Sequence, residues 1–471
     1  MDSNIAEPLF EIEANYPHLQ HTRYRGYNVW AIVRFLLRIQ LANPPKQKNT
    51  SFKSLLSRIK WGSIRSASFV KEIIAEKSKW FARYDVVVFS NRFEKRLVQE
   101  QMIDKLTSGI IENCEASGLK VLVVNYGDPE NKENIKFRST HMIDGRKLYY
   151  FLGSIPSFYT KTKRKALVQQ LESSGPAADY DHLAEELDLY IWGIKLFQRL
   201  YKIWQPRIVF MPDYSGFAEV YSANVSGIRT VEIQHGNINS FHPGYVTSLS
   251  IDRNFYASNL LVFGEHSLLN VNNSIYKTNE VHIVGNYYLE KIFQQPLRTE
   301  LQQLIRSYRL SVCIPYDVTD EKFIFEFIKS IVAASADVIF IFSIRYEVPA
   351  GLKALKDSFS NVHIETRLPF QEIVRCCDFN TCSFSTCALE APSLGKPNIL
   401  IATDPRTKIY FENKLDHKHT FFASTPEEYL AVLNNNSIPL IPVDEVRQGN
   451  SKNIATGYRK NLEHFFSTIN F

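Results

Sequence analysis

Short apolar runs, separated by longer amphipathic stretches, recur along most of this 471-residue chain. The runs are almost continuously apolar, as expected of strands that are covered on both faces in a parallel α/β sheet. In the first half of the chain they predict strands at 85–90, 119–125, 207–212 and 229–234. In the second half they predict strands at 281–285, 309–314, 337–342, 361–365, 397–402 and 419–423, with a further short strand just before 383–386.

The stretches between these strands have the spacing of helices. Residues 180–204 predict a long helix with an acidic start and a basic end, which suits the helix dipole. Residues 321–336 predict another helix, capped by Thr319 and Asp320, and residues 454–466 a terminal one. Because strands and helices alternate in two batches, the sequence predicts an α/β protein with two doubly wound, Rossmann-like domains.

A polar, Asn-rich stretch at 265–280 separates the two batches. We therefore predict an N-terminal domain over 1–275, a C-terminal domain over 276–445 and a terminal segment over 446–471. Residues 40–66 are rich in Pro, Lys and Ser and predict a surface excursion.

Residues 29–41 form an apolar stretch that carries Arg34 and Arg38 on its other face. It fits a core helix of the first domain or a helix lying on a membrane surface, and the core helix is favoured. No run reaches the roughly 18 apolar residues of a membrane span. The first residues are polar and acidic, so we expect no signal peptide and a cytoplasmic protein with reduced thiols.

Composition narrows the function classes. Hydrophobic residues make up 45% of the chain, enough for sizeable cores, and the net charge of +6 mildly favours anionic ligands. No basic run or base-stacking module accompanies that charge, so we do not expect nucleic-acid binding. Cys377, Cys382 and Cys387 recur every five residues, which matches no usual zinc spacing, so we expect no metal.

Candidate chemistry lies at the strand ends, because ligands of open α/β sheets bind beyond the carboxyl ends of the strands. The predicted strand 207–212 is followed by Asp213, and 229–234 leads into His235. If the two strands are neighbours, both side chains face one site, with Asp213 as a base or nucleophile and His235 as a proton donor or phosphate-orienting group. A turn or cap formed by Asp213 and a turn-locking hydrogen bond from His235 are equally open.

The segment around this histidine adds further candidates. Glu232 lies inside the strand, where an unpaired carboxylate is costly, so it needs a structural or functional partner. Gln234 and Gly236 flank the histidine, and the glycine would let backbone N–H groups approach an anion. His242 and Tyr245 follow in a His-Pro-Gly-Tyr loop, where a structural role is as well supported as a catalytic one.

A second cluster lies in the second half of the chain. A short strand ends at Ser383, Ser385 and Thr386 open a helix, and Glu390 follows inside it. Hydroxyls and N–H groups at a helix start suit an anion, and a glutamate there can accept hydrogen bonds from a ribose diol. The alternative is an ordinary helix cap with an ordinary helical glutamate.

Two further residues follow strands of the same half. Tyr316 comes after the run at 309–314, and Arg345 after the run at 337–342. Strand-end logic places both on the edge that carries the second cluster. The alternative for each is a solvated loop residue.

Three pieces of the chain resemble GT-B type glycosyltransferases of bacterial capsule and lipopolysaccharide assembly. Residues 24–37 (YRGYNVWAIVRFLL) resemble their N-terminal Gly…Trp…Arg helix, and 232–245 (EIQHGNINSFHPGY) their Gln-His-Gly…His-Pro-Gly-Tyr segment. Residues 281–286 (VHIVGN) and 385–400 (STCALEAPSLGKPNIL) resemble the nucleotide-sugar half shared with UDP-sugar 2-epimerases and teichoic-acid glycerophosphotransferases. The resemblance covers roughly residues 20–430, in patches.

The resemblance implies a GT-B architecture, in which an acceptor domain and a nucleotide-sugar domain face a cleft and the terminal segment crosses back to the first domain. It implies a nucleotide-sugar co-substrate, no other cofactor, no metal, and a glycan or lipid-linked glycan acceptor. With the strand-end positions, it assigns catalysis to Asp213, His235 and Glu232. The nucleotide-sugar residues are then Gln234, Gly236, Tyr316, Arg345, Ser383, Ser385, Thr386 and Glu390, and the acceptor-side residues are His242 and Tyr245.

The sequence departs from the family pattern at two places. Many relatives carry Lys-x-His-Pro after the strand that matches 337–342, where this chain has Ser-Ile-Arg-Tyr, so Arg345 would take the cationic role. Tyr287 follows the Val-Gly-Asn motif where the epimerases usually have Pro. These departures leave the donor open.

We therefore predict a glycosyltransferase that moves a sugar from a nucleotide-sugar to a growing surface glycan, in the cytoplasm and in peripheral contact with the inner face of the membrane. One alternative is a glycerophosphotransferase that uses CDP-glycerol. A less favoured one is a UDP-sugar 2-epimerase, whose typical Gly-Thr-Arg-Pro-Glu and Asp-Ser-Gly-Gly motifs the sequence lacks. A further alternative is a non-catalytic scaffold, but that class of protein would be expected to lack polar residues at the strand ends. The linkage, the anomeric outcome and the oligomeric state stay open.

Overall fold

The chain divides into two compact units. The computed structural model describes residues 3–42, 67, 69–90, 95–98, 101–126, 141–148, 161–172, 178–239, 242–267, 273–345, 347–435 and 441–471. Unit 1 consists of Met1–Val262 and Leu268–His282, and unit 2 of Phe263–Ser267 and Ile283–Phe471. The predicted excursion at 40–66 lies outside the described residues beyond position 42. The roles given to the two predicted domains, and the return of the terminal segment to the first, stay predictions.

Unit 1 contains a seven-stranded sheet in the order β11-β10-β9-β8-β3-β6-β7. Its strands are β3 (Val86–Ser90), β6 (Val121–Asn125), β7 (His141–Asp144), β8 (Ile208–Met211), β9 (Arg229–Ile233), β10 (Asn259–Val262) and β11 (Val281–Ile283). The pairs from β10 across to β7 are parallel. Every residue of β3, β6 and β8 is buried, which explains why their sequences are continuously apolar.

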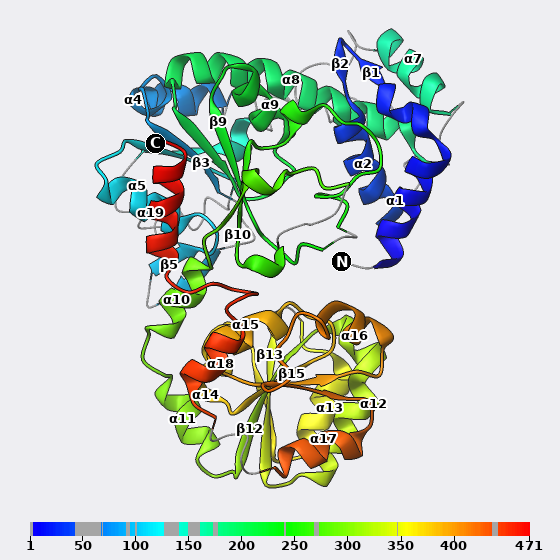
Figure 1. Ribbon diagram of the computed structural model, residues 1–471, viewed down its shortest axis with the longest axis vertical. Coiled ribbons are helices and arrows are strands. Elements are labelled where there is room, and N and C mark those ends of the chain that lie inside the picture. Colours follow the sequence, from blue (N-terminus) through cyan, green and yellow to red (C-terminus); the bar gives the residue numbers. More distant parts are fainter. Residues whose placement is uncertain are drawn as a thin grey trace. The chain divides into compact units, whose positions relative to one another are not determined.

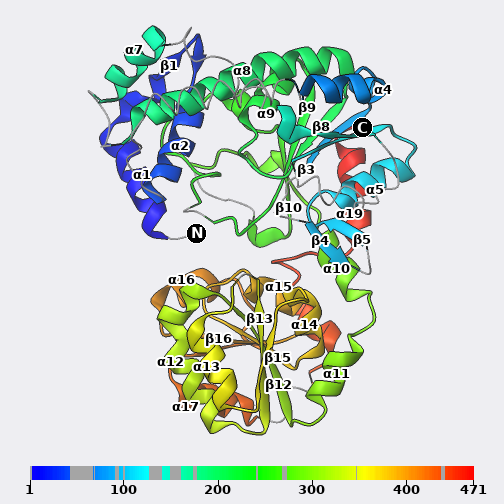
Figure 2. The same cartoon turned by 180° about the vertical axis from the view of Figure 1, so that it is seen from behind.

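Helices and two small hairpins surround this sheet. They are α1 (Ser3–Asn15), α2 (Trp30–Ala42), α4 (Lys77–Trp80), α5 (Ser108–Ala116), α7 (Lys161–Glu172), α8 (Tyr180–Trp204), α9 (Phe217–Val225), β1-β2 (Arg23–Tyr24, Tyr27–Asn28) and β4-β5 (Lys95–Val98, Gln101–Asp104). In both views, α1, α2 and α7 lie at one end of unit 1 and α5 at the other (Figures 1 and 2). Helix α8 confirms the predicted helix 180–204, and the Asp179 side chain caps it by accepting from the His182 N–H.

Helix α2 is a core helix. Trp30 and Ile32 are fully buried, and Arg34 and Arg38, on the face expected to meet water or a membrane, are only 2% and 9% exposed. The core-helix interpretation of 29–41 is therefore confirmed. A membrane-surface role for this helix is contradicted, because its cationic face is covered by protein.

Unit 2 contains a six-stranded parallel sheet in the order β14-β13-β12-β15-β16-β17. The strands are β12 (Leu310–Tyr316), β13 (Val338–Ile344), β14 (Val362–Glu365), β15 (Phe379–Cys382), β16 (Asn398–Ile401) and β17 (Thr420–Ala423). The sheet is covered on both faces: α12 and α13 lie on one side and α14 and α18 on the other in both views (Figures 1 and 2). This is the doubly wound arrangement that the apolar runs predict.

The helices of unit 2 come before β12, between the strands of the sheet and after β17 in the sequence. They are α10 (Tyr287–Phe293), α11 (Thr299–Ile305), α12 (Val318–Ala334), α13 (Ala350–Ser358), α14 (Phe370–Cys376), α15 (Cys387–Ser393), α16 (Pro405–Phe411), α17 (Pro426–Leu433), α18 (Val443–Gly449) and α19 (Tyr458–Thr468). Thr319 and Asp320 were expected to cap the helix at 321–336. They lie instead inside its first turn, because α12 begins at Val318 directly after β12.

One strand prediction needs correction, and two strands of the first sheet were not predicted. The run at 281–285 was expected to open the second sheet, but β11 is the edge strand of the first one, beside β10. Strand β10 was not predicted, because its four residues, Asn259–Val262, merge into the polar stretch that follows. Strand β7, with the sequence His-Met-Ile-Asp, was missed because it contains only two apolar residues. Within the described residues, no helix is both long and apolar enough to cross a bilayer.

Candidate functional site

The topology of unit 1 selects one point on the carboxyl edge of its sheet. From β3 the chain continues outward to β6 and β7, and then returns to β8, β9, β10 and β11 on the other side. The strand order therefore reverses between β3 and β8, and open α/β sheets bind ligands outside the carboxyl ends at such a reversal. Asp213 lies two residues after β8. Strands β8 and β9 are parallel neighbours with Met211 opposite Glu232, so His235, two residues after the end of β9, lies on the same edge.

Asp213 forms a turn at the end of β8. Its Oδ1 accepts a hydrogen bond from the Ser215 backbone N–H at 2.7 Å and another from the Ser215 hydroxyl. The structure therefore contains the turn that was one of the two interpretations of Asp213. The same bonds fix a half-buried carboxylate at the strand end, so they are compatible with the predicted catalytic role.

His235 carries an unsatisfied nitrogen. Its ring lies 5.8 Å from the Tyr214 ring, between centroids. The Nδ1 atom is enclosed and has no hydrogen-bond partner among the described residues. An enclosed polar atom without a partner is costly, so this nitrogen is a feature of the site that the described residues leave unexplained. Beside it, a Cβ on Gly236 would meet no atom within 4 Å, so the backbone there faces open space. The Gln234 amide donates to the Gly236 carbonyl at 2.7 Å and holds this turn.

Tyr214 is the centre of the cluster, and the sequence analysis did not select it. It is 8% exposed, and its ring lies 5.7 Å from those of both His242 and Tyr245. Arg38 donates a hydrogen bond to its hydroxyl. A Cβ on Gly244 would lie 2.6 Å from the Tyr214 ring, so only glycine lets the His-Pro-Gly-Tyr loop wrap this side chain.

His242 is neutral and has a defined tautomer. Its Nδ1 accepts a hydrogen bond from the Gly244 N–H at 3.1 Å, so the ring proton lies on Nε2. Burial, with smaller contributions from His235 and Arg38, lowers the pKa of His242 to about 3. The ring is 8% exposed and lies 4.8 Å from that of Tyr245. These contacts give it a role in holding the loop, and its predicted place on the acceptor side stays a prediction.

Glu232 receives its partners from two tyrosines. It is 1% exposed, and its two oxygens accept hydrogen bonds from the Tyr245 hydroxyl at 2.8 Å and the Tyr276 hydroxyl at 2.5 Å. Burial raises the pKa of Glu232 to about 7, against the effect of the two hydroxyl donors. A group so enclosed holds the hydroxyls of Tyr245 and Tyr276, and the catalytic role predicted for it stays a prediction.

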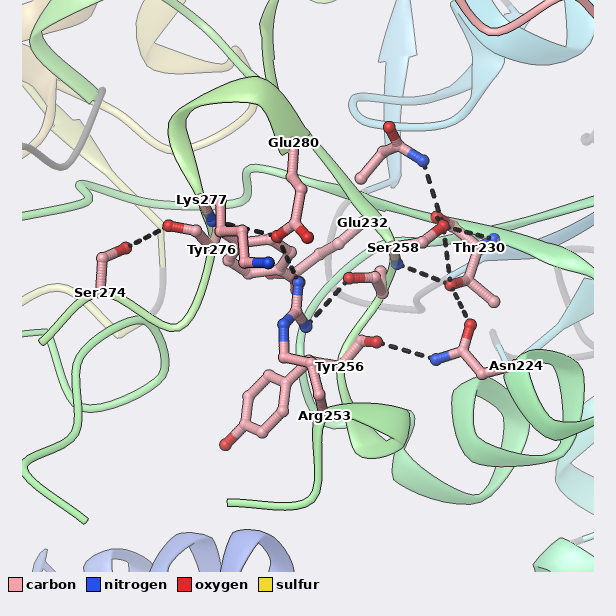
Figure 3. Close-up of polar contacts among 12 residues, drawn as sticks. Asn224, Thr230, Glu232, Arg253, Tyr256, Ser258, Ser274, Tyr276, Lys277 and Glu280 are labelled. Carbon is pink, nitrogen blue, oxygen red and sulfur yellow. Dashed lines mark hydrogen bonds and ion pairs between the residues drawn. The ribbon is translucent and has the colours of Figure 1, made fainter. Parts of the chain in front are cut away.

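An arginine side chain packs against Tyr276, the second tyrosine of this pair. The Arg253 guanidinium lies 4.7 Å from the Tyr276 ring centroid and donates to Glu280 at 2.6 Å (Figure 3). Close by, the hydroxyls of Thr230 and Ser258 and the amide of Asn224 join β9 to α9 and to the residue before β10 (Figure 3). These partners could not be predicted from the sequence, because they come from separate elements and loops.

A buried ion pair anchors the loop from the side of α1 and α2. Arg34 Nε and Glu13 Oε1 lie 2.9 Å apart, with side-chain exposures of 2% and 0%. The same guanidinium donates to the backbone carbonyls of Pro243 and Val246, and Glu13 accepts from the Ser248 N–H at 2.8 Å. Helix α2, which carries Arg34, therefore positions the His-Pro-Gly-Tyr loop, a role that its sequence pattern did not reveal.

In unit 2 the strand order reverses between β12 and β15. Tyr316 ends β12, is 3% exposed and packs edge-on against Phe342 with centroids 5.6 Å apart. Ser383 follows β15, and its hydroxyl lies 2.9 Å from that of Thr407. Arg345 follows β13 directly and is exposed. Register places these three residues on one carboxyl edge, since Ile344 pairs with Tyr316 and Cys313 with Asn380.

The start of α15 lies at the same reversal. Ser385 Oγ accepts from the Cys387 N–H at 3.3 Å, whereas Thr386 is exposed and makes no side-chain cap. Glu390 lies in the first turn of α15 and accepts a hydrogen bond from the Gln371 amide of α14. The Gln371 partner was not predicted, because nothing in the local pattern of α14 distinguishes it from a solvent-facing glutamine.

Three buried thiols are poorly reactive because of their surroundings. Burial raises the pKa of both Cys114 and Cys382 to about 12, and the pKa of Cys313 rises well above its ordinary value for the same reason. In the part of the chain that the structure describes, no three or more His, Cys, Asp or Glu side chains are arranged to hold a metal ion.

Comparison with known proteins identifies the fold. A structure assigned as a UDP-N-acetylglucosamine 2-epimerase from Listeria monocytogenes matches with a TM-score of 0.53 at 12% identity, over 82% of this chain and 96% of that one. The glycotransferase of kitacinnamycin matches with a TM-score of 0.51 at 11% identity, over 81% and 99%. The UDP-GlcNAc 2-epimerase from Methanocaldococcus jannaschii matches with a TM-score of 0.50 at 13% identity, over 82% and 99%. No family model and no curated protein matches the sequence. The chain therefore has the GT-B fold, two parallel-sheet α/β domains, as predicted.

Proposed function

We propose that the protein is a glycosyltransferase that moves a sugar from a nucleotide-sugar donor to a growing bacterial surface glycan. The observation that carries this proposal is the position of Asp213 and His235 at the strand reversal of unit 1, in a chain with the GT-B fold. Its support from the sequence is the Gln-His-Gly…His-Pro-Gly-Tyr segment. The capsule or lipopolysaccharide context rests on that resemblance, as does a cytoplasmic location.

The chemistry proposed for unit 1 is proton transfer. His235, or Asp213 beside it, removes the proton of an acceptor hydroxyl, and the oxygen attacks the anomeric carbon of the donor. The bond between that carbon and the phosphate oxygen breaks, and the nucleotide leaves with the bonding electrons. If the reaction retains configuration, Asp213 attacks the anomeric carbon instead and forms a covalent intermediate. Tyr214, Arg38 and the loop held by Arg34 fix the geometry of the base.

The chemistry proposed for unit 2 is donor binding. Ser385 and Thr386 at the start of α15 bind the donor phosphates, Arg345 stabilises the charge on the leaving phosphate, and Glu390 binds the ribose. Support comes from the strand reversal between β12 and β15, since α15 begins shortly after β15. The hydrogen bond from the Gln371 amide orients the Glu390 carboxylate, which suits the role proposed for it in ribose binding.

A second candidate is a sugar 2-epimerase that acts on a UDP-sugar. It is favoured by the two epimerase structures among those that match the fold. The missing Gly-Thr-Arg-Pro-Glu and Asp-Ser-Gly-Gly motifs count against it. The two functions differ in one simple respect, since an epimerase acts on its nucleotide-sugar without any acceptor.

The first experiment is a thermal-shift screen with UDP, GDP, CMP, CDP and their sugars, with CDP-glycerol included. A ligand that binds only the native state at about one hundred times its Kd adds about 2.7 kcal/mol of stability. The nucleotide that stabilises the chain is then incubated as its sugar without an acceptor. Conversion of the sugar under these conditions would identify an epimerase, and stabilisation by CDP-glycerol alone would identify a glycerophosphate transferase. No stabilisation by any nucleotide would refute the proposal.

The second experiment replaces the side chains proposed to act as the base and to bind the donor. Asp213→Ala and His235→Ala should abolish transfer and leave the melting temperature and nucleotide binding of the protein close to the wild-type values. Glu390→Ala should weaken nucleotide binding, measured by calorimetry, whereas Gln371→Ala should weaken it less. Transfer at the wild-type rate in both unit 1 variants would remove these residues from the mechanism.

A further inference from the structure

One side of a helical segment of unit 1 packs against the rest of the unit, and the other side is exposed to solvent. Residues 69–75 and α4 (Lys77–Trp80) follow each other with a single turn residue between them. Trp80 is 2% exposed, packs on Phe69 with ring centroids 5.6 Å apart, and accepts a hydrogen bond on its carbonyl from the Trp204 indole at 3.0 Å. The segment is therefore attached to the end of α8 through these aromatic residues.

The opposite face exposes large apolar side chains. Val70 is 50% exposed, Ile74 71% and Phe81 56%. Val70 and Ile74 lie one turn apart in the helical residues 69–75. Lys77 and Phe81 lie one turn apart across α4, where the Phe81 N–H donates to the Lys77 carbonyl. We call these four exposed positions the 70–81 face. Large apolar side chains with this exposure, gathered on one face, mark an interaction surface more often than scattered single ones do.

The charge exposed beside this face is positive. Lys71, Lys77 and Arg83 are exposed. Both acidic residues of the segment are paired. Glu72 is 7% exposed and binds Lys147 and the Asp144 N–H, and Glu76 pairs with Lys79 at 2.6 Å. The stretch 43–66, which precedes the segment in sequence, contains Lys46, Lys48, Lys53, Arg58, Lys60 and Arg65 and no acidic residue.

We propose that the 70–81 face docks on the surface of an anionic lipid bilayer. Apolar side chains interleaved with Lys and Arg suit this partner, because the former enter the boundary of the acyl chains and the latter meet anionic headgroups. A second copy of the chain fits less well, since a two-fold contact would place Lys77 against the same positive face of its partner. Nucleic acid fits less well too, since Ile74 and Phe81 would be pressed against phosphates.

This surface differs from the one expected from sequence. The cationic face of the helix at 29–41 is buried against the His-Pro-Gly-Tyr loop and Tyr214, so it cannot meet lipid. The 70–81 face adjoins the aromatic contact with Trp204, which precedes β8, and so lies away from the carboxyl edge that carries Asp213 and His235. Docking there does not depend on which group the protein transfers.

The test is co-sedimentation of the full chain with phosphatidylcholine vesicles, with and without phosphatidylglycerol. Wild-type protein should sediment only with the anionic vesicles, and added salt should weaken binding. Ile74→Glu should lower the apparent affinity at least about tenfold. The matched control is Ile409→Glu, because Ile409 of α16 in unit 2 is 70% exposed against 71% for Ile74. That variant should bind as the wild type does.

Two further measurements separate the remaining outcomes. Lys71→Glu with Lys77→Glu should weaken binding in low salt and have little effect in high salt, and circular dichroism checks that each variant is folded. Absence of wild-type binding to anionic vesicles would overturn the proposal. So would equal losses in Ile74→Glu and Ile409→Glu. A concentration-dependent dimer in ultracentrifugation that Ile74→Glu abolishes, without vesicle binding, would assign the face to a second copy and likewise overturn the proposal.

Discussion

The carboxyl edges of the two sheets are built in opposite ways. In unit 1 the residues behind the strand ends form a dense buried network, with Glu232, His242 and Arg34 between 1% and 8% exposed. In unit 2 the corresponding edge carries Thr386 and Arg345, which are exposed. Charge and aromatic rings are buried in the first edge, whereas in the second the Thr386 hydroxyl and the Arg345 cation lie at the surface beside the buried Tyr316 and Ser383.

The difference indicates two kinds of site. Burying polar groups costs free energy, even when they are hydrogen-bonded to one another. Removing one member of such a network lowers protein stability, because its partner is left buried without a bond. In return, the network holds a neighbouring side chain in a single geometry. Exposed hydroxyl and cationic groups contribute little to stability and remain accessible to an anionic ligand. Under the proposed function, unit 1 would therefore supply a preorganised base and unit 2 an adaptable binding surface.

The largest expected effect comes from the buried ion pair. Arg34→Ala leaves Glu13 enclosed at 0% exposure without its cation, which should lower the free energy of unfolding by about 3–5 kcal/mol. The matched control is Arg459→Ala, because Arg459 pairs with Glu463 at the surface with side-chain exposures of 77% and 55%. Its cost should stay below about 1 kcal/mol. Urea unfolding measures both, and equal shifts of the urea midpoint would contradict the contrast.

The pH dependence of stability comes next in size. A pKa of about 7 for Glu232, against an ordinary value of 4.5, means that the folded state holds a proton that the unfolded state releases. The stability from this carboxyl is fully present below pH 4.5 and is lost as pH rises through 7, by roughly 3 kcal/mol. Glu232→Gln should flatten the fall over this window in urea unfolding. An unchanged pH profile in the variant would show that other groups cause the fall.

Two glycines of one loop region give the third test. Gly244→Ala would place a Cβ 2.6 Å from Tyr214, which should cost about 1–3 kcal/mol of stability. Gly236→Ala meets no atom within 4 Å and should leave the melting temperature unchanged. If a substrate group lies beside Gly236, that variant should instead reduce activity. A melting temperature that falls equally in both variants would contradict the packing around Tyr214.

The smallest effect on stability is expected at the edge of unit 2. Thr386→Ala and Ser385→Ala should change the free energy of unfolding by no more than about 0.5 kcal/mol. If their hydroxyls bind donor phosphate, nucleotide affinity by calorimetry should fall by roughly tenfold for each. Ser330→Ala, an exposed hydroxyl on α12, serves as the control and should not change it. Unchanged affinity in all three variants would remove α15 from the donor site.

Much of the framework could be read from the sequence, because the signals for it are local. The apolar runs of β3, β6 and β8 are buried over their whole length, and the periodic pattern of α8 spans the helix from Tyr180 to Trp204. Strand β10 and the placement of β11 were missed, because a four-residue strand next to a polar stretch carries too few apolar positions to be distinguished from a loop. Asp213 and His235 were selected by the strand-end rule, which needs only the order of elements.

The partners of these residues could not be predicted in the same way. Tyr214 meets Arg38 across 176 positions of sequence, and Glu13 meets Ser248 across 235. No periodicity links residues so far apart, so an arginine of a buried helix has the same local pattern as one that faces water. For this reason Arg38 looked like a surface residue, and Tyr214 like any aromatic residue in a loop.

What the sequence determined by itself was the alternation of strands and helices, the strand ends at which polar residues collect, and the amphipathic faces of the longer helices. These follow from the period of apolar positions, which depends on neighbours a few residues away. Only the tertiary structure decided that Glu232 is enclosed by Tyr245 and Tyr276, that α2 turns its arginines inward, and that the apolar side chains at 70–81 turn outward. Burial is a property of the whole packed chain, and it decides which charges are structural and which remain open to a partner.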